Sequence, residues 1–98
     1  MRRGTTPTIT ITTDIDLTQA SNLFVTFKQG GDGIAFEKTL DEVTVTENAV
    51  ICELEQNDTL ALKDGLVMIQ IRATLGDSKV ASNIMTASVD AILKGGAI

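Results

Sequence analysis

The sequence predicts an all-β fold in which two antiparallel sheets pack face to face. Its longest apolar alternation places Val67, Ile69 and Ile71 on one face. An alternation with a period of two is typical of a strand, and these inward side chains are β-branched. Residues 49–55 form another expected strand, so residues 56–62 must turn a corner between the two. Such a corner carries the chain from one sheet of a sandwich to the other.

The other strands are expected where apolar and polar residues alternate between turn residues. These segments are 8–13, 22–29, 34–38, 42–47 and 79–90. The last of them is expected to break near Ser82 and Asn83. Together the segments make about seven short antiparallel strands with turns every 8 to 12 residues, which is typical of an immunoglobulin-like β-sandwich.

The connections between strands carry recognisable turn residues. Gly30–Gly33 predicts a hairpin loop, because glycine adopts positive φ without steric cost. Glu47 and Asn48 are expected to join two strands tightly, at a position where asparagine tolerates a left-handed conformation. Residues 14–21 are polar and rich in turn residues, with room for one short helical turn. Residues 76–78 form a further turn.

The expected core is aliphatic, because the chain has three Phe and neither Trp nor Tyr. Its predicted members are Leu23, Val25, Phe27, Phe36, Val50, Cys52, Leu54, Leu60, Leu62, Val67, Ile69 and Ile71. A single cysteine cannot form an internal disulfide. Cys52 alternates in register with Val50 and Leu54 and has no histidine to activate it. We therefore interpret it as a small buried hydrophobe and not as a nucleophile.

The corner departs from that of antibody domains, which have a Cys–Trp–Cys core and a corner tyrosine. This sequence has neither feature. We expect Leu60 and Leu62 to fill the volume instead. The side chains of Asn57, Asp58 and Thr59 are expected to hydrogen-bond the backbone of the corner.

The chain is expected to form one sandwich domain, 8–93, between an extended N-terminal arm, 1–7, and a C-terminal tail, 94–98. The net charge is −5, and without Arg2 and Arg3 the chain has 6 basic and 13 acidic residues. A basic arm therefore precedes an acidic body, and we expect it to cross to a neighbouring subunit or a partner protein. The alternative is that both ends fold back on their own domain. The candidate protein-contact residues are Arg2, Arg3, Gly4, Thr5, Thr6, Pro7, Gly95, Gly96 and Ile98.

Composition argues against several classes of partner and location. A net charge of −5 argues against nucleic acid, whose recognition needs a basic surface. No apolar run approaches the ~20 residues of a membrane span. No hydrophobic region follows the two N-terminal arginines, so we expect no signal peptide and a chain that folds in a cytoplasm.

Two groups of carboxylates are candidates for chemistry. Asp14 and Asp16, with Asp32 or Asp58, could ligate calcium at a loop end of the sandwich. We favour solvated turn carboxylates, because the further ligands of an EF-hand loop are missing. Glu53–Glu55 resembles a glycosidase pair in its spacing, but two exposed, outward carboxylates are the simpler interpretation.

The glycine-rich loop 30–33 follows a strand, as a phosphate-binding loop does. It lacks the required lysine and no helical pattern follows it, so we interpret it as a hairpin loop. We expect no catalytic residue, metal or cofactor.

Four segments carry a resemblance to a known family: MRRGTTPT, LTQASNLFVTFKQGG, LEQNDTLALKDGLVMIQIR and ASNIMTASVDAILKGG. They resemble small proteins of bacteriophage structural gene clusters, which look like the immunoglobulin-like N-terminal domain of phage baseplate upper proteins. The resemblance covers nearly the whole chain and rests on short phrases, not on a catalytic motif. It implies a non-enzymatic virion or prophage protein, made in the host bacterial cytoplasm, whose partners are other phage proteins. It brings no catalytic residues.

The expected function is therefore structural: an immunoglobulin-like module that self-associates and docks onto head, neck, tail or baseplate proteins. The alternative is a binding module for a host cell-surface glycan or protein. That alternative is weaker, because carbohydrate sites usually have aromatic platforms and the chain lacks Trp and Tyr. An enzyme is the weakest interpretation, because the chain has no histidine, no activated cysteine and no convergent carboxylates.

Overall fold

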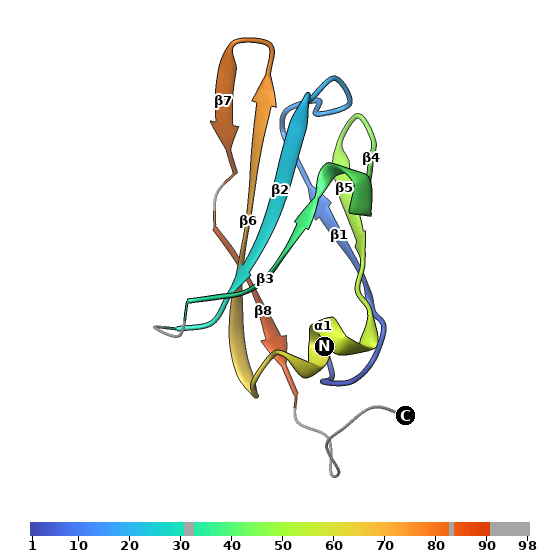
Figure 1. The fold of residues 1–98 in the computed structure, drawn as a ribbon, viewed down its shortest axis with the longest axis vertical. Coiled ribbons are helices and arrows are strands. Elements are labelled where there is room, and N and C mark those ends of the chain that lie inside the picture. The colour runs from blue at the N-terminus through green and yellow to red at the C-terminus, as the bar shows by residue number, and fades with distance from the viewer. Residues whose placement is uncertain (31–32, 83, 91–98) are drawn as a thin grey trace.

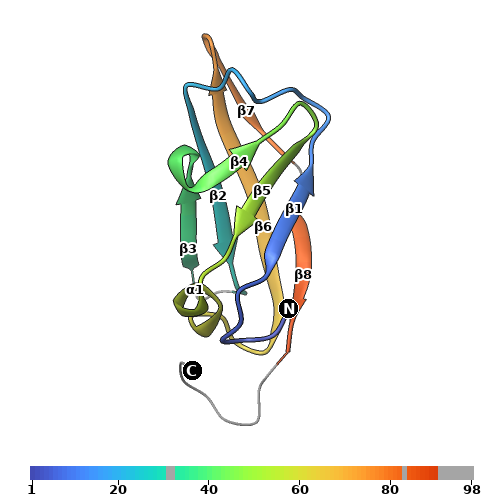
Figure 2. The same ribbon diagram turned by 90° about the vertical axis from the view of Figure 1, so that its right-hand side faces the viewer.

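The computed structural model describes residues 1–30, 33–82 and 84–90 and confirms an all-β fold of two packed sheets (Figure 1). The small sheet has the order β1-β5-β4, with β1 at Thr8–Thr12, β5 at Ala49–Glu53 and β4 at Val43–Val45. The large sheet has the order β3-β2-β6-β7, and β8 also pairs with β6. Its strands are β3 (Ile34–Thr39), β2 (Asn22–Lys28), β6 (Gly65–Leu75), β7 (Ser78–Ala81) and β8 (Met85–Val89). Figure 2 shows the small sheet in front of the large one.

The long strand β6 is the centre of the large sheet. One of its edges pairs with β2 along its length, from Asn22↔Thr74 to Lys28↔Met68. Its other edge is shared, because β8 pairs with its first half and β7 with its second half. The expected last strand is therefore two strands with a break between them, close to the predicted position.

Ser82 supplies hydrogen bonds to β6 at this break between β7 and β8. Its backbone N–H donates to the Ile71 carbonyl at 2.8 Å, and its hydroxyl oxygen accepts from the Ile71 N–H at 3.0 Å. The Ser82 carbonyl accepts from the Gln70 side-chain amide at 2.9 Å. A side chain thus takes the place of a strand partner and keeps the buried backbone groups of β6 bonded.

The core lies between the two sheets and largely follows the predicted inward positions. Every predicted core residue is buried except Phe36 and Leu60, which are partly buried. Phe36 stacks on Phe27 with ring centroids 4.3 Å apart. The core also contains side chains outside the predicted set: Ile11, Leu17, Ala73 and Val89.

Two of the predicted turns connect antiparallel strands as expected. Gly30 and Gly33 both have positive φ, at 52° and 86°, between the antiparallel strands β2 and β3, as a hairpin loop requires. Gly31 and Asp32 lie outside the described residues. The tight connection at Glu47 and Asn48 is also present, but Asn48 does not use a left-handed conformation, because no described residue other than glycine has positive φ. The Thr46 N–H donates to the Ala49 carbonyl at 2.9 Å and closes this turn.

Two short helical segments replace expected strand or turn structure. The strand expected from 42 begins at Val43, because Leu40–Glu42 forms a 3-10 turn, η1. The Glu42 carboxylate accepts from the N–H of Thr39 at 3.1 Å and fixes the start of this turn. The corner contains a helix, α1, at Gln56–Leu60. Residues 14–21 contain no helical turn, only bends and a turn.

Candidate interaction site

The N-terminal residues lie on their own domain. Arg2 forms a parallel bridge with Asp90, just beyond β8. The Met1 carbonyl accepts from the Asp90 N–H at 2.7 Å, and the Arg3 N–H donates to the Asp90 carbonyl at 3.1 Å. The N-terminal arm therefore follows the alternative considered for it, because its first residues fold back on their own domain and add to the edge of the large sheet.

The rest of the arm is held against α1. The Arg3 guanidinium donates to the carbonyls of Leu60, at 3.0 Å, and Leu62. These carbonyls lie at the end of α1, where a helix leaves acceptors without intrahelical partners and favours a cation. Gly4 is buried, and its carbonyl accepts from the Gln56 side chain at 3.0 Å.

The last residues of the arm complete its attachment. The Thr5 carbonyl accepts from the hydroxyl of the fully buried Thr59 at 2.7 Å. The Pro7 carbonyl accepts from the Leu54 N–H at 2.9 Å and starts the pairing of β1 with β5. Thr6 is exposed. The candidate contact residues of the arm that remain exposed are Arg2, Thr5 and Thr6.

The other candidate contact residues, Gly95, Gly96 and Ile98, lie outside the described residues. So does the whole tail, 94–98, and the predicted end of the sandwich domain after residue 90.

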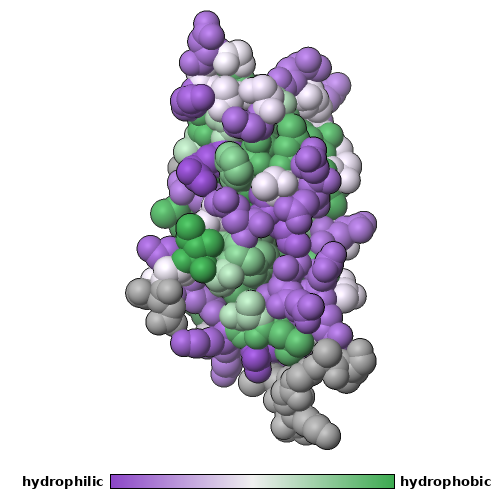
Figure 3. Space-filling model, in the orientation of Figure 1, coloured by the Kyte–Doolittle hydropathy of each residue, from purple (hydrophilic) through white to green (hydrophobic). Residues whose placement is uncertain are grey.

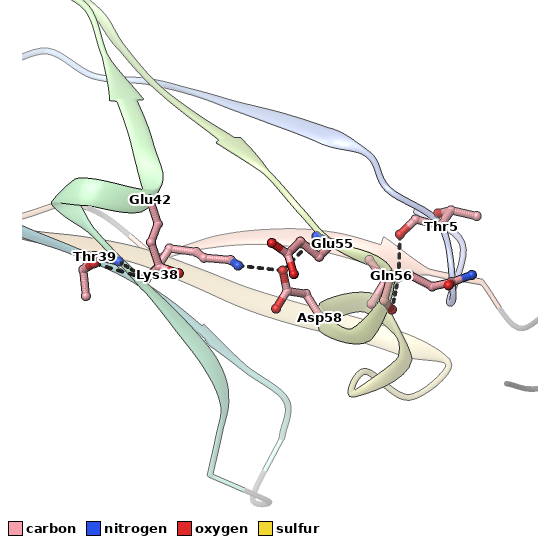
Figure 4. A network of polar contacts seen from close by, with 8 residues as sticks. Thr5, Lys38, Thr39, Glu42, Glu55, Gln56 and Asp58 are labelled. Atoms are coloured by element: carbon pink, nitrogen blue, oxygen red, sulfur yellow. Dashed lines mark hydrogen bonds and ion pairs between the residues drawn. The ribbon is translucent and has the colours of Figure 1, made fainter. Parts of the chain in front are cut away.

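The corner prediction is confirmed for Asp58 and Thr59, and Figure 4 shows Asp58 beside Glu55 and Lys38. The Asp58 carboxylate accepts from the Glu55 N–H at 2.8 Å, which caps the start of α1. The Thr59 hydroxyl donates to the Gln56 carbonyl at 3.2 Å as well as to Thr5. Leu62 is fully buried and fills the volume as expected, whereas Leu60 is only partly buried. The side chains of Asp58 and Thr59 thus stabilise the backbone of the corner.

Lys38 also contacts the corner, and the sequence interpretation did not predict this contact. It lies on β3, is 7% exposed, and forms an ion pair with Asp58 at 2.6 Å across the gap between the sheets (Figure 4). Its ammonium group also lies 5.9 Å from the Phe36 ring centroid. Burial alone would lower the pKa of Lys38, but the hydrogen bond and charge of Asp58, with Glu42 and Glu55 nearby, raise it.

Cys52 is fully buried, as predicted. Burial raises the pKa of its thiol to about 11, against a smaller opposing effect of the Lys38 charge. A thiol with this pKa is almost entirely protonated at neutral pH and is a poor nucleophile.

Among the carboxylates considered for calcium, those that the structure describes do not converge. Asp16 accepts from the N–H and hydroxyl of Thr18, at 2.9 and 2.6 Å, and this lowers its pKa. Asp58 is engaged by Lys38, and Asp32 lies outside the described residues. Within the described ranges no three acidic or cysteine side chains are grouped closely enough to hold a metal ion. Glu53 and Glu55 are both exposed.

The outer face of the large sheet carries an apolar cluster. Four large hydrophobic side chains are strongly exposed among the described residues: Ile34 (62%), Leu66 (65%), Ile84 (60%) and Ile15 (47%). Ile34 and Ile84 line one shallow hollow of about 450 Å³ with Met68. Leu66 shares the outward face of β6 with Met68, two residues along the strand.

Strand register explains why these residues meet. Lys28 on β2 pairs with Ile34 on one side and Met68 on the other. Met68 in turn pairs with Thr86 on β8. The row Ile34–Lys28–Met68–Thr86 therefore crosses the sheet from edge to edge, with two apolar side chains in it. In Figure 3 the sandwich is seen edge-on. Hydrophobic patches lie between the two sheets and along the margin of the large sheet.

Charged side chains share the outward face of the large sheet with this cluster. Lys28, Arg72 and Lys79 are exposed on the same outward face. Arg72 donates to the Glu37 carboxylate at 3.1 Å and lies over the Phe24 ring, 5.4 Å from its centroid. Glu37 therefore neutralises Arg72 on this face, and Lys28 and Lys79 are its other basic side chains.

No helix among the described residues has the length and apolar character needed to cross a membrane.

Comparison of the chain with protein-family models, with curated proteins and with solved structures found no match.

Some of the contacts that were not predicted have a recognisable pattern in the sequence. Lys38 lies two residues after Phe36 on the same strand, so both side chains point to the inward face. Thr39 and Glu42 fit the capping pattern in which a threonine is followed three residues later by a glutamate. Gln29 gives no such signal, although its buried side chain accepts from the Lys63 N–H and donates to the Lys63 carbonyl, both at 2.7 Å.

Proposed function

We propose that the chain is a non-enzymatic structural protein of a bacteriophage or prophage particle. In this role it is an immunoglobulin-like module that self-associates and docks onto other head, neck, tail or baseplate proteins. The resemblance of four segments to small phage structural proteins supports this function. Its partners are other phage proteins and its place is the virion.

The strand order supports the immunoglobulin-like part of the proposal. Immunoglobulin domains carry strands ABED in one sheet and CFG in the other, with C′ added in the variable type. The order β1-β5-β4 corresponds to B-E-D, and β3-β2-β6 followed by β7 and β8 corresponds to C′-C-F-G. The helix α1 then occupies the corner between E and F, where antibody domains place a tyrosine.

The observation that carries the structural role is the apolar cluster on the large sheet. Three of the four strongly exposed large hydrophobic side chains described, Ile34, Leu66 and Ile84, lie on this one face. Scattered exposed hydrophobic residues are normal, but a cluster of them marks an interaction surface. A broad sheet face with only a shallow hollow suits a protein partner better than a small ligand, which binds in a deep, enclosed site.

Mass spectrometry of purified particles tests the proposal. Particles released from a host that carries the gene are separated from the lysate on a density gradient, and peptides of this chain are quantified against the major capsid protein. We expect a fixed ratio of the two across independent preparations. Complete particles that contain none of this chain, while it remains in the lysate, would contradict a virion role.

A glycan array separates this role from the alternative. A structural module binds no glycan on the array above the signal of a denatured control. Specific binding that survives in the purified, unassembled protein would favour a host-surface binding module instead.

A further inference from the structure

One edge of the small sheet is open. The sheet has the order β1-β5-β4, so β1 forms one of its margins (Figure 2). Of the strands that the structure describes, only β5 pairs with β1. Immunoglobulin domains place strand A beside strand B in this sheet. In the correspondence given above β1 is strand B, but the arm that precedes it bonds to Asp90 and to α1 instead. The position of strand A beside β1 is therefore accessible to another chain.

Alternate backbone groups of β1 point to this open edge. The Pro7 carbonyl, just before β1, accepts from the Leu54 N–H on the β5 side. Residues of an antiparallel strand bond alternately to one neighbour and to the other. Odd-numbered residues of β1 therefore bond to β5, and the even-numbered ones direct their N–H and C=O groups outward: Thr8, Thr10 and Thr12. These groups have no hydrogen-bond partner within the described part of the chain.

The edge of β1 also lacks the features that protect other edges from pairing. Protected edges are short, charged, bulged or covered. The margin strand β4 has only three residues, β3 points the charged Lys38 inward, and β7 has four residues, one of them Lys79. The arm bonds to the end of β8. By contrast, β1 has five residues, TITIT, all β-branched and uncharged, which favours strand pairing.

The large sheet does not close over this edge. A hollow of about 320 Å³ separates the end of β1 from the break between β7 and β8, and its lining includes Thr12, Thr13, Val80 and Met85. Ile9 points to the core side of β1 but is only partly buried. A strand added beside β1 would therefore cover an apolar side chain as well as satisfy backbone groups.

We propose that β1 of one copy pairs antiparallel with β1 of a second copy, about a two-fold axis at Thr10. The pairing joins two three-stranded sheets into one sheet of six strands. This inference rests on the self-association in the proposed function and names the strand that performs it.

The sequence of β1 identifies a second copy as the occupant. TITIT reads the same in both directions, so the two-fold register places Thr10 opposite Thr10, and Thr8 opposite Thr12 of the second copy. All of these threonines direct their backbone groups outward, so each pair exchanges main-chain hydrogen bonds. Ile9 then faces Ile11 on the core side, and threonine faces threonine on the outer side. Such β-branched and hydroxyl pairs stabilise neighbouring strands, and no like charges meet.

Other registers are less complementary. A slip of one residue would set outward-directed backbone groups opposite groups already bonded to β5, and it would place threonine opposite isoleucine on inverted faces. A slip of two residues keeps the hydrogen bonds but shortens the paired segment. The register centred on Thr10 uses all five residues of β1.

Charge variants at the axis test the pairing. Thr10→Lys and Thr10→Glu each place two like charges directly opposite one another in the dimer. Thr44→Lys and Thr44→Glu are the matched controls, because Thr44 is also exposed and also lies opposite Ile51, but on β4. Thermal unfolding first checks that each variant is folded.

The readout is the mass distribution in sedimentation. The parent should form a dimer of twice the 10.4 kDa monomer mass. Thr10→Lys alone and Thr10→Glu alone should each dimerise at least about fivefold more weakly, because like charges face each other. Their mixture should form a one-to-one dimer, since lysine then faces glutamate. Both Thr44 variants should dimerise like the parent.

A backbone variant tests the hydrogen bonds separately. Thr10→Pro removes an outward N–H and leaves the bonds to β5 in place, a position at which an edge strand tolerates proline. It should dimerise at least about tenfold more weakly, since two hydrogen bonds at the axis are lost. Thr10→Val keeps the N–H and the shape of the side chain, and should dimerise like the parent.

Three outcomes would overturn the pairing. A parent that stays monomeric does not pair through β1. Thr10 variants that associate as tightly as the parent would place the interface elsewhere. If Thr10→Lys and Thr10→Glu each lose association and their mixture does not regain it, β1 binds a different surface of the second copy. In each case the role in the particle is judged separately, by the mass spectrometry of purified particles.

Discussion

Lys38 on β3 and Asp58 on α1 form an ion pair of 2.6 Å that joins the large sheet to the corner leaving the small sheet. Their side chains are only 9% and 18% exposed. Asp58 also caps α1 through the Glu55 N–H. One carboxylate therefore neutralises a buried lysine and holds the start of a helix, so the position of the corner depends on it.

Asp58→Ala should lower the free energy of unfolding by ~3–5 kcal/mol, because it leaves a buried lysine without its counter-charge. Loss of the cap alone would cost only ~0.5–2 kcal/mol. Urea unfolding followed by circular dichroism measures the difference. Glu53→Ala, at an exposed carboxylate on β5, is the control and should change stability by less than ~0.5 kcal/mol.

The double variant Lys38→Met/Asp58→Ala separates the two contributions. It removes both charges, so its loss of stability should be smaller than the sum of the Asp58→Ala and Lys38→Met losses by ~0.5–3 kcal/mol of coupling. A double variant whose loss equals the sum of the two single losses would show that the pair has no net interaction.

Stability should fall at high pH, and two groups set the window. Burial raises the pKa of Cys52 from 9.0 to about 11, so between these values the unfolded chain loses the thiol proton and the folded chain retains it. The unfolded state then binds fewer protons, and the free energy of unfolding decreases as pH rises. Two pKa units correspond to roughly 2–3 kcal/mol.

Lys38 adds to this loss at higher pH. Its pKa is raised above 10.5 in the folded protein, so its stabilising effect is present below 10.5 and is lost as pH rises through the folded value. Thermal unfolding across pH 8 to 12 compares the parent with Cys52→Ala. The variant should not lose stability between pH 9 and 10.5, and it should still lose stability at higher pH as Lys38 is deprotonated. An unchanged profile in this variant would contradict the thiol assignment.

The alternation of apolar residues predicted most of the fold, because burial of one strand face imposes a period of two. Val67, Ile69 and Ile71 are buried on β6 for this reason. Cys52 and the hairpin glycines followed from equally local signals. The strand break was predicted near Ser82, but not the serine's role in the ladder, because that bond depends on the position of Ile71 eleven residues earlier.

The contacts of the arm were beyond prediction for the same reason. Arg3 binds carbonyls at Leu60 and Leu62, far along the chain, and charge alone suggested an exposed basic arm. The apolar cluster was also not apparent, because Ile34, Leu66 and Ile84 are separated in sequence and meet only through strand register.

Ile69→Ala should lower the free energy of unfolding by ~2–5 kcal/mol, the usual cost of a buried large-to-small substitution. Ile69 is 4% exposed at the centre of β6. Leu66→Ala on the same strand is the control, since Leu66 is 65% exposed. Chemical denaturation at low protein concentration compares them, and equal losses in the two variants would mean that the burial pattern of β6 is wrong.

Deletion of residues 1–6 should destabilise the domain itself, since the arm bonds to α1 and to the edge of β8. Arg3→Ala alone should cost ~1–3 kcal/mol, because two hydrogen bonds from a charged group to the end of α1 are lost. Thr6→Ala, at an exposed arm residue, should be neutral. A truncated protein that melts like the full chain would show that the arm is not attached in solution.

The most direct test of the structural role is sedimentation of the unmodified chain over a range of concentrations, at low and at physiological salt. Self-association predicts species heavier than the 10.4 kDa monomer that grow with concentration. A mass of 10.4 kDa at every concentration and salt condition would contradict the self-association proposed for this chain.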